Sequence, residues 1–235
     1  SDKKTKTIRF TQEKVHDFGW FADKRYHVLK GKVELPYSGR TVTLYTMFTN
    51  NEAHLWKNSI EYMHDAVYYY SLWNGDYPYN YCTAVDGTIA AGGGMEYPNV
   101  TVIGESGSPK MLEEVIMHEV GHNWFYGMLA SNERDHPWMD EGLNSFDELR
   151  YMRLKYPEHN LLTGGIPTSL TRIFDLKDAT NKNIQGELMY FMNAWTGKDQ
   201  PIELHSCKYT GMNYGGIVYS KTAIVFDYLM AYLGE

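Results

Sequence analysis

The sequence predicts an α+β fold in which a mixed lobe of sheet and helices is followed by a helical lobe. Extended segments dominate the first half of the 235 residues, and apolar residues at helical spacing dominate the second half. Apolar residues make up 43% of the chain and charged residues 22%, which is enough core material for a folded protein and too much for a disordered one. The length suits one domain or two closely packed lobes.

Four extended segments are expected in the first lobe. Residues 28–35 and 41–49 flank a turn sequence at 36–39, which predicts a hairpin. In the second of these segments Val42, Leu44 and Phe48 alternate with residues of the opposite face. Residues 79–85 and 96–103 are also expected to be extended, joined through a glycine-rich stretch.

Four helices are expected, the first over about 52–75, where Gly75 terminates a run with steps of three and four. The second opens with Ser108 as its N-cap and Pro109 in its first turn, and runs to about Gly127. The third spans about 140–156 and is expected to bury Leu143, Phe146 and Leu149 or Arg150; the last spans about 216–233.

Charge and hydropathy exclude two classes of protein. The net charge is −7 and lysine and arginine form no run, so the chain lacks the clustered cations of a nucleic-acid binder. No stretch approaches eighteen uncharged apolar residues, so no membrane span is expected. The two cysteines, Cys82 and Cys207, allow either one disulfide or two buried thiols.

The strongest chemical signal is His118-Glu119-Val120-Gly121-His122 within the second expected helix. Side chains at i and i+4 share one helix face, so both imidazoles can reach one metal ion while Glu119 lies beside it. A hydrolytic zinc site needs a third protein ligand and an open position, and Glu141 in the next helix meets that need. Glu148, two turns further along, is placed to orient a ligating imidazole.

A second signal is Gly93-Gly94-Met95-Glu96. No helix and no Lys-Ser/Thr pair follows the glycines, which argues against a phosphate cradle. Glycines beside a strand instead leave room for another backbone, such as a peptide that adds itself to the sheet edge.

These motifs carry a family resemblance. HExxH followed by eighteen residues and a glutamate is similar to the zinc-ligand pattern of gluzincin peptidases, and Gly-x-Met-Glu resembles the exopeptidase motif of the aminopeptidase N family, which includes the leukotriene hydrolases. Further similarities lie at Trp124-Phe125, at residues 138–142 and at Tyr219-Ser220-Lys221. The likeness covers most of residues 50–155 and 214–234. It implies a thermolysin-like, two-lobed zinc peptidase catalytic domain with one Zn²⁺ per chain.

The resemblance also implies roles. His118, His122 and Glu141 would hold zinc and Glu119 would be the general base, with Glu148 behind a ligand. Glu96 would bind the α-ammonium of a peptide with a free amino terminus, in a substrate-binding segment that includes Gly93, Gly94 and Met95. Tyr219 would stabilise the oxyanion, with Tyr209 and Tyr214 as rivals. Two positions depart from the family pattern, Tyr97 in place of asparagine and Thr222 in place of glycine.

The expected function is therefore a zinc-dependent aminopeptidase. The alternatives are an endopeptidase or epoxide hydrolase that uses the same metal, and a catalytically weak or inactive peptide-binding fragment of this scaffold. Residues 1–30 are expected to be a linker and the last strands of a preceding β-rich domain; residues 31–127 would form the mixed lobe and 128–235 the helical lobe. A helical domain that closes the cleft is expected to follow in the full-length protein. The abundance of tyrosine favours a bacterial envelope, periplasmic or secreted enzyme.

Overall fold

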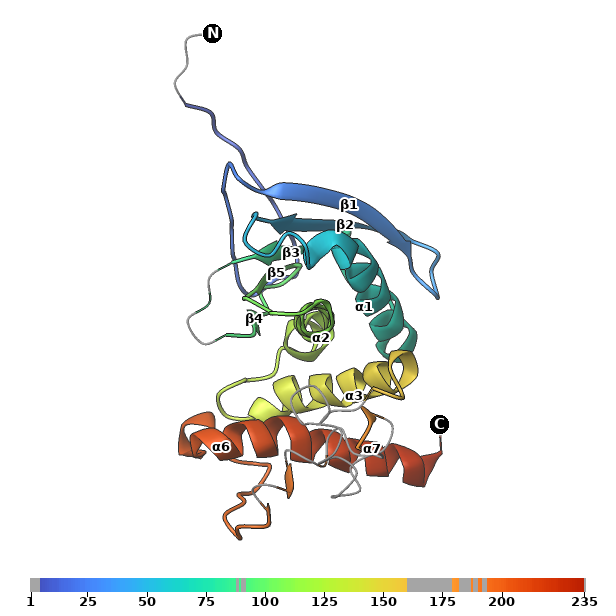
Figure 1. Cartoon of the computed structure of the whole chain (residues 1–235), viewed down its shortest axis with the longest axis vertical. Helices are drawn as coiled ribbons and strands as arrows, with labels where there is room; N and C mark the ends of the chain where they lie inside the picture. Colours follow the sequence, from blue (N-terminus) through green and yellow to red (C-terminus); the bar gives the residue numbers. More distant parts are fainter. Residues whose placement is uncertain are drawn as a thin grey trace, which may run out of the picture.

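Five strands form one mixed sheet on one side of the molecule (Figure 1). The computed structural model describes residues 5–87, 89, 92–159, 179–181, 187, 190–191 and 194–234. Strand order is β1-β2-β3-β5-β4. β1 (His27–Glu34) and β2 (Thr41–Phe48) form the expected hairpin, and β2 runs parallel to β3 (Tyr81–Asp86). β3 is parallel to β5 (Val100–Ile103), and β4 (Gly94–Met95) closes the edge antiparallel to β5.

The single strand expected over residues 96–103 is wrong in its first half. Asn99 adopts a left-handed conformation with φ +54°, and the Val100 amide donates to the Tyr97 carbonyl in a turn. Pro98 has no amide hydrogen to contribute to a ladder, which favours the turn over a continuous strand. The edge strand is instead Gly94–Met95, so Glu96 lies just beyond its end.

Two helices cover the inner face of the sheet. α1 (Ser59–Asn74) follows a short 3₁₀ turn and ends at Gly75, whose φ of +91° suits a glycine. α2 (Pro109–Gly121) begins as expected, because the Ser108 hydroxyl accepts a hydrogen bond from the Met111 amide at 3.2 Å. The buried side chains of β2 and of both helices form one hydrophobic core.

α2 ends at Gly121, six residues earlier than expected. Helical turns continue through Asn123–Met128, but Phe125 and Tyr126 leave the helical conformation, and Tyr126 has φ +100°. The aromatic run after the motif therefore makes a kink, and the Gly127 amide donates back to the His122 carbonyl. The kink turns the chain toward the second lobe.

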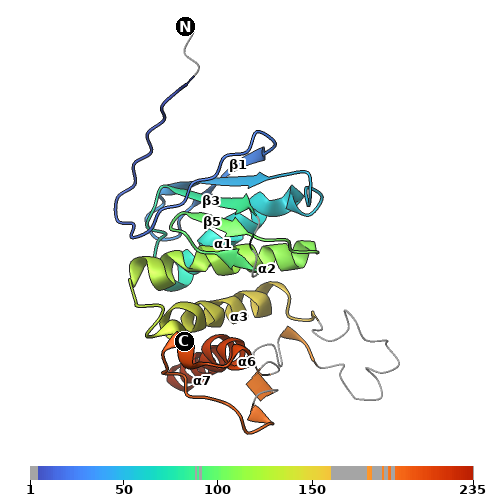
Figure 2. The ribbon, with the colours of Figure 1, turned by 90° about the vertical axis from the view of Figure 1, so that its left-hand side faces the viewer.

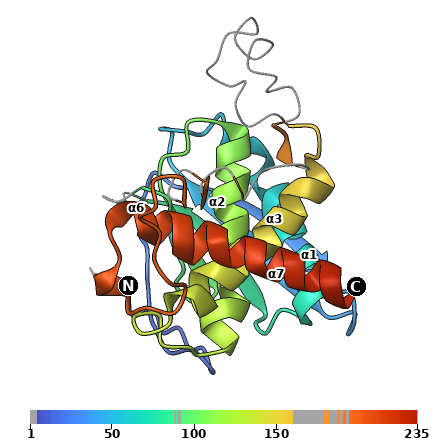
Figure 3. The same ribbon diagram turned by 90° about the horizontal axis from the view of Figure 1, so that it is seen from below.

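The helical lobe lies beneath α2 (Figures 1 and 2). A helical turn at Trp138–Gly142 leads into α3 (Leu143–Lys155). The last helical segment starts at Gly211, before the expected start at 216, and runs as α6 (Gly211–Asn213), a wider turn at Tyr214–Lys221 and α7 (Thr222–Leu233). From below, α7 crosses the other helices (Figure 3). This mixed lobe over a helical lobe confirms the predicted α+β class.

α3 buries a more polar face than its apolar spacing predicts. Leu149 is buried, but Leu143 and Phe146 are only partly so, while Asn144 and Asp147 are at most 1% exposed. These polar side chains bond to neighbouring helices: Asn144 donates to the His118 carbonyl in α2, and Asp147 accepts from Asn74 at the end of α1.

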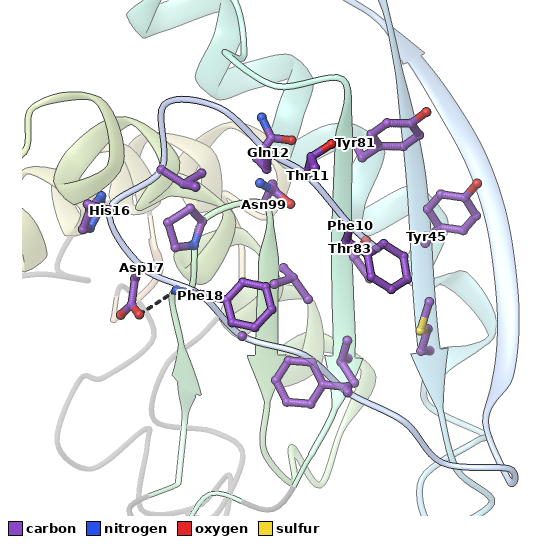
Figure 4. A pocket seen from close by; sticks show the side chains of 17 residues that line it. Phe10, Thr11, Gln12, His16, Asp17, Phe18, Tyr45, Tyr81, Thr83 and Asn99 are labelled. Carbon is purple, nitrogen blue, oxygen red and sulfur yellow. Dashed lines mark hydrogen bonds between the residues drawn. The ribbon is translucent and has the colours of Figure 1, made fainter. Parts of the chain in front are cut away.

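The outer face of the sheet lies away from α1 and α2. Residues 5–26 form no helix or strand and run across this face. They leave a groove of about 1160 Å³ between themselves and the strands, lined by Phe10, Phe18, Tyr45 and Tyr81 among others (Figure 4).

The structure also bears on the state of the two cysteines and on the possibility of a membrane span. Cys82 is a buried free thiol and Cys207 an exposed one, so there is no disulfide and only one of the two thiols is buried. Within the described residues, no helix combines the length and the apolar character needed to cross a bilayer.

Candidate metal centre and active site

Three side chains from two helical segments converge on one point between the lobes. The Nε2 atoms of His118 and His122 are 3.2 Å apart, and Glu141 Oε2 lies 3.1 Å from the first and 3.3 Å from the second. Ligands at about 2.0–2.1 Å around a tetrahedral zinc ion would be about 3.3 Å apart. The triangle of atoms therefore fits one zinc ion with its fourth position open, as the sequence predicts.

The other nitrogen of each imidazole is held by a carboxylate. His118 Nδ1 lies 2.9 Å from Glu148 Oε2, and His122 Nδ1 lies 2.6 Å from Asp140 Oδ1. Such contacts fix the tautomer and the orientation of a ligating ring. Glu148 was predicted from its spacing, whereas the role of Asp140 was missed. Its position directly before Glu141 is the signal that could have revealed it.

The helical turn at Trp138–Gly142 explains how two consecutive acidic residues serve one imidazole. This turn is wider than an α-helix, a form that often occurs at functional sites. Asp140 reaches Nδ1 of His122 while Glu141 reaches Nε2 of the same ring. The pair therefore clamps His122 from both sides.

A second missed residue, Asn144, locks α2 against α3. Its amide donates to the His118 carbonyl at 2.7 Å, and its Oδ1 accepts from the Tyr70 hydroxyl at 2.6 Å. A Cβ at position 121 would overlap both Asn144 and Tyr70, so glycine is required within the motif. This contact sets the distance between the helices that carry the ligands.

The electrostatics of the three proposed ligands are strongly coupled. Burial alone lowers the pKa of His118, but hydrogen bonds to Glu141 and Glu148 outweigh it and raise the pKa to about 10. Burial likewise lowers the pKa of His122, yet the charges of Asp140 and Glu141 raise it well above its ordinary value. Burial raises the pKa of Glu141, but the two histidines bring it below its usual range. A metal ion must therefore displace protons from the imidazoles.

Glu119 lies beside this triangle with one oxygen unused. Glu119 is 5% exposed, and its Oε2 is buried without a hydrogen-bond partner among the residues that the structure describes. Burial raises the pKa of Glu119 to about 7 against the opposing charges of the histidines. A buried carboxylate with a free oxygen is poised to accept a proton from a water molecule or ligand.

The glycine-rich segment contacts Glu119 directly. A Cβ at position 94 would overlap the Glu119 carboxyl group, while Gly93 needs its positive φ of +71° and accepts a hydrogen bond from the Gly104 amide. Met95 continues the edge strand, paired with Val102. From the sequence, these glycines are expected to leave room for a peptide. In the structure, Gly94 also leaves room for the Glu119 carboxyl group.

Glu96 lies at the end of that edge strand, close to the triangle. One atom each of Glu96, Glu119 and His122 fall within 4.8 Å of one another. Burial raises the pKa of Glu96, and the charge of His122 opposes that rise. Tyr97, at the position where the family has asparagine, packs against Gly19 of the N-terminal segment.

Tyr219 is the tyrosine placed at the triangle. Its ring stacks 5.9 Å from that of His118, and its phenol lies close enough to Glu141 for that carboxylate to shift its pKa. Burial, followed by the charge of Glu141, raises its pKa far above the ordinary value. Tyr214 packs 6.0 Å from Tyr219, whereas Tyr209 points elsewhere and donates to the Ile202 carbonyl.

Thr222, the second departure from the family pattern, sits inside the last helical segment. Its hydroxyl donates to the Ile217 carbonyl at 3.1 Å, and its methyl group occupies the space that a side chain at Gly142 would need. The glycine at 142 thus accommodates the threonine at 222.

Comparison with solved structures shows the same fold in zinc metallopeptidases. The M1 zinc metallopeptidase of Deinococcus radiodurans matches with a TM-score of 0.58 at 14% identity, over 89% of this chain and 41% of that one. A mutant of that enzyme bound to a Tyr-Ser-Ala substrate gives 0.56 with the same identity and coverage. Legionella pneumophila aminopeptidase A, in complex with aspartic acid, gives 0.59 at 14% identity over 89% of this chain and 23% of its own.

The chain therefore spans less than half the length of the solved structures it resembles. Among curated proteins, none matches the sequence. The model of the peptidase family M1 domain matches residues 59–235. This range includes the three residues whose atoms form the triangle, and also Glu119, Glu96 and Tyr219. The chain belongs to peptidase family M1.

Proposed function

We propose that this chain is the catalytic part of a zinc-dependent aminopeptidase, with His118, His122 and Glu141 as the ligands of one Zn²⁺. The observation that carries the proposal is the triangle of ligand atoms 3.1–3.3 Å apart, beside a buried glutamate with an unpartnered oxygen. Two imidazoles and one carboxylate are the donor set of hydrolytic zinc sites, and both imidazoles carry the carboxylate partners typical of such sites.

The ion would supply Lewis acidity, lowering the pKa of a water molecule from about 15.7 toward 7 and polarising the scissile carbonyl. Glu119 takes up the proton that this water loses as it attacks the carbonyl carbon. The pKa near 7 lets Glu119 then release the same proton to the departing amine. Gly94 keeps the carboxylate in place, because any side chain there would displace it.

Tyr219 is the proposed donor to the oxyanion. Its hydroxyl lies at Glu141 and its ring is fixed against His118, so it is oriented before substrate arrives. The strongly raised pKa keeps the phenol protonated, as a hydrogen-bond donor must be. The position of Tyr209 makes it unsuited to this role.

Glu96 is the proposed reason for cleavage at the amino terminus. A carboxylate within 4.8 Å of His122 and Glu119 lies near one residue's length from the reacting bond, where it can bind the free α-ammonium of a peptide. The neighbours bound to a tripeptide or an amino acid support this substrate class.

Hydrolysis of matched peptides tests the proposal. The zinc-loaded chain should cleave the first residue from a free peptide and leave the N-acetylated peptide intact, since acetylation removes the ammonium. Glu119→Gln should lower turnover by about 10²–10⁴-fold with zinc content unchanged. Internal cleavage of the acetylated peptide would favour the endopeptidase alternative. Zinc binding with no hydrolysis of either peptide would favour the peptide-binding fragment.

A further inference from the structure

The charge of the chain is divided unevenly along the sequence. Residues 1–40 contain ten lysines and arginines against five acidic residues, a net charge of +5. Residues 41–235 contain twelve against twenty-four, a net charge of −12. A basic segment attached to an acidic remainder is typical of proteins that meet an anionic surface through that segment.

Strand β1 directs two of these cations to the outer face of the sheet. Side chains alternate along a strand, and Gly31 faces α1, because a Cβ there would overlap Ile60. Lys30 and Lys32 therefore lie on the opposite, outer face, where both are exposed. Lys30 Nζ lies 5.6 Å from the centre of the Tyr45 ring on the neighbouring strand, so cations and aromatic rings share this face.

The N-terminal segment, residues 5–26, brings further cations across the same face (Figure 2). Arg25 is paired with Asp23, but the exposed acids Glu13 and Asp17 leave this segment with a surplus of positive charge. Together with the two lysines of β1, its remaining exposed cations form what we call the basic face: Lys6, Arg9, Lys14, Lys24, Lys30 and Lys32. None of these six is in an ion pair with another residue that the structure describes.

Large apolar side chains are exposed between these cations. In the N-terminal segment, Ile8 is 58%, Phe10 80%, Phe18 71% and Trp20 73% exposed. Phe10 and Phe18 lie over the groove that the outer face of the sheet lines (Figure 4). Single exposed apolar residues are common, but four on one short segment that crosses an apolar groove indicate a surface that another phase or partner covers.

We propose that the basic face and these apolar side chains bind the surface of an anionic phospholipid bilayer. The lysines and arginine would lie at the lipid phosphates, and the phenylalanine and tryptophan rings would enter the interfacial layer. The net charge of −12 on the remainder of the chain would be repelled by the same bilayer, which favours an approach with the basic face first.

The observations favour a bilayer over a nucleic acid or a folded partner. Aliphatic side chains such as Ile8 and Val28, both more than half exposed, cannot stack on bases. The apolar side chains of the N-terminal segment stand on a stretch with no helix or strand, and so present no fixed shape for a folded partner to complement. A fluid bilayer needs no such complementarity.

Co-sedimentation of the chain with lipid vesicles tests the proposal. Vesicles of phosphatidylcholine with phosphatidylglycerol should bind it at least about tenfold more tightly than vesicles of phosphatidylcholine alone, and added salt should weaken the binding. Lys30→Gln with Lys32→Gln should lower the affinity by about 20-fold, because each lysine at an anionic surface contributes about fivefold. Trp20→Ala should lower it by about tenfold through the loss of apolar contact.

Matched variants in the helical lobe serve as controls. Lys198→Gln with Lys208→Gln removes two exposed lysines there, and Trp195→Ala removes a tryptophan that is 91% exposed. Both should bind the vesicles as wild type does. Zinc affinity, measured for every variant, should stay unchanged, which separates loss of the surface from loss of the fold. Equal losses in the test and control pairs would show that only net charge matters and would overturn the proposal.

Other results would also overturn it. Wild type could fail to bind either kind of vesicle, or bind both equally. Tighter binding to a single-stranded oligonucleotide than to the anionic vesicles would indicate a nucleic-acid surface. Self-association in sedimentation velocity that Lys30→Gln with Lys32→Gln abolishes would indicate a second copy as the partner. The metal centre has no part in this inference, so each of these results leaves the proposed peptidase function intact.

Discussion

Replacing Asp140 by alanine tests whether the contacts behind the histidines build the metal site. Asp140 is 2% exposed and its bond to His122 is 2.6 Å long, while the only other acceptor at that nitrogen among the described residues is the Phe125 carbonyl at 3.2 Å. Loss of such a partner lowers metal affinity by about 10–100-fold, or about 1.4–2.7 kcal/mol. Asp140→Ala should therefore raise the zinc dissociation constant by that factor.

The loss of zinc affinity in Asp140→Ala should also depend on pH. Asp140 also raises the pKa of His122, so the wild-type chain must give up a proton that the variant holds less tightly. At neutral pH the lower cost of deprotonating His122 in Asp140→Ala offsets part of its loss of zinc affinity. This advantage shrinks as the pH rises, so the loss of affinity should be larger at pH 9 than at pH 7. The assay is competition for zinc with a chelator of known affinity at both pH values. Asp135→Ala, exposed in the preceding loop, is the control. Unchanged affinity in Asp140→Ala at both pH values would refute the reasoning.

Three further predictions follow from the same site. Gly94→Ala should lower kcat by about 10²-fold with zinc content unchanged, because the new methyl group displaces the Glu119 carboxylate, whereas Gly215→Ala, with open space around it, should be neutral; equal activities would contradict the packing argument. Tyr219→Phe should lower kcat by about 10²–10³-fold while Tyr209→Phe leaves it unchanged, and equal effects of the two would exclude Tyr219 as the oxyanion donor. The pKa of His118 is raised from 6.5 to about 10, so its contribution to stability is present below pH 6.5 and is lost as pH rises through about 10; the chelator-treated chain should melt at a lower temperature at pH 9.5 than at pH 6, and an equal or higher melting temperature would contradict this.

Much of the fold follows from the sequence because the local signals agree with the tertiary packing. The hairpin, α1 and the start of α2 each have a turn or cap whose chemistry is local, such as the Ser108 hydroxyl on the Met111 amide. The end of α2 and the start of the last helical segment were placed wrongly because these limits depend on contacts distant in sequence. Nothing in the sequence indicates the kink at Tyr126, because a positive φ is unusual for tyrosine.

The residues of the candidate site likewise include some that sequence spacing predicts and some that it does not. The spacing of His118, His122 and Glu141 predicts that they meet, and the structure brings their atoms to within 3.3 Å. Asp140 was missed because it acts on a histidine eighteen residues away, and a single acidic residue has no periodicity to distinguish it. The buried polar face of α3 was missed for a related reason: Asn144 and Asp147 are inside because they serve neighbouring helices, which apolar spacing cannot indicate.

Anomalous diffraction at the zinc edge is the most direct test of the central claim. Crystals of the zinc-loaded chain should show one peak about 2.0–2.1 Å from His118 Nε2, His122 Nε2 and a Glu141 oxygen. No peak among these three atoms, or a zinc ion bound elsewhere on the chain, would contradict the account.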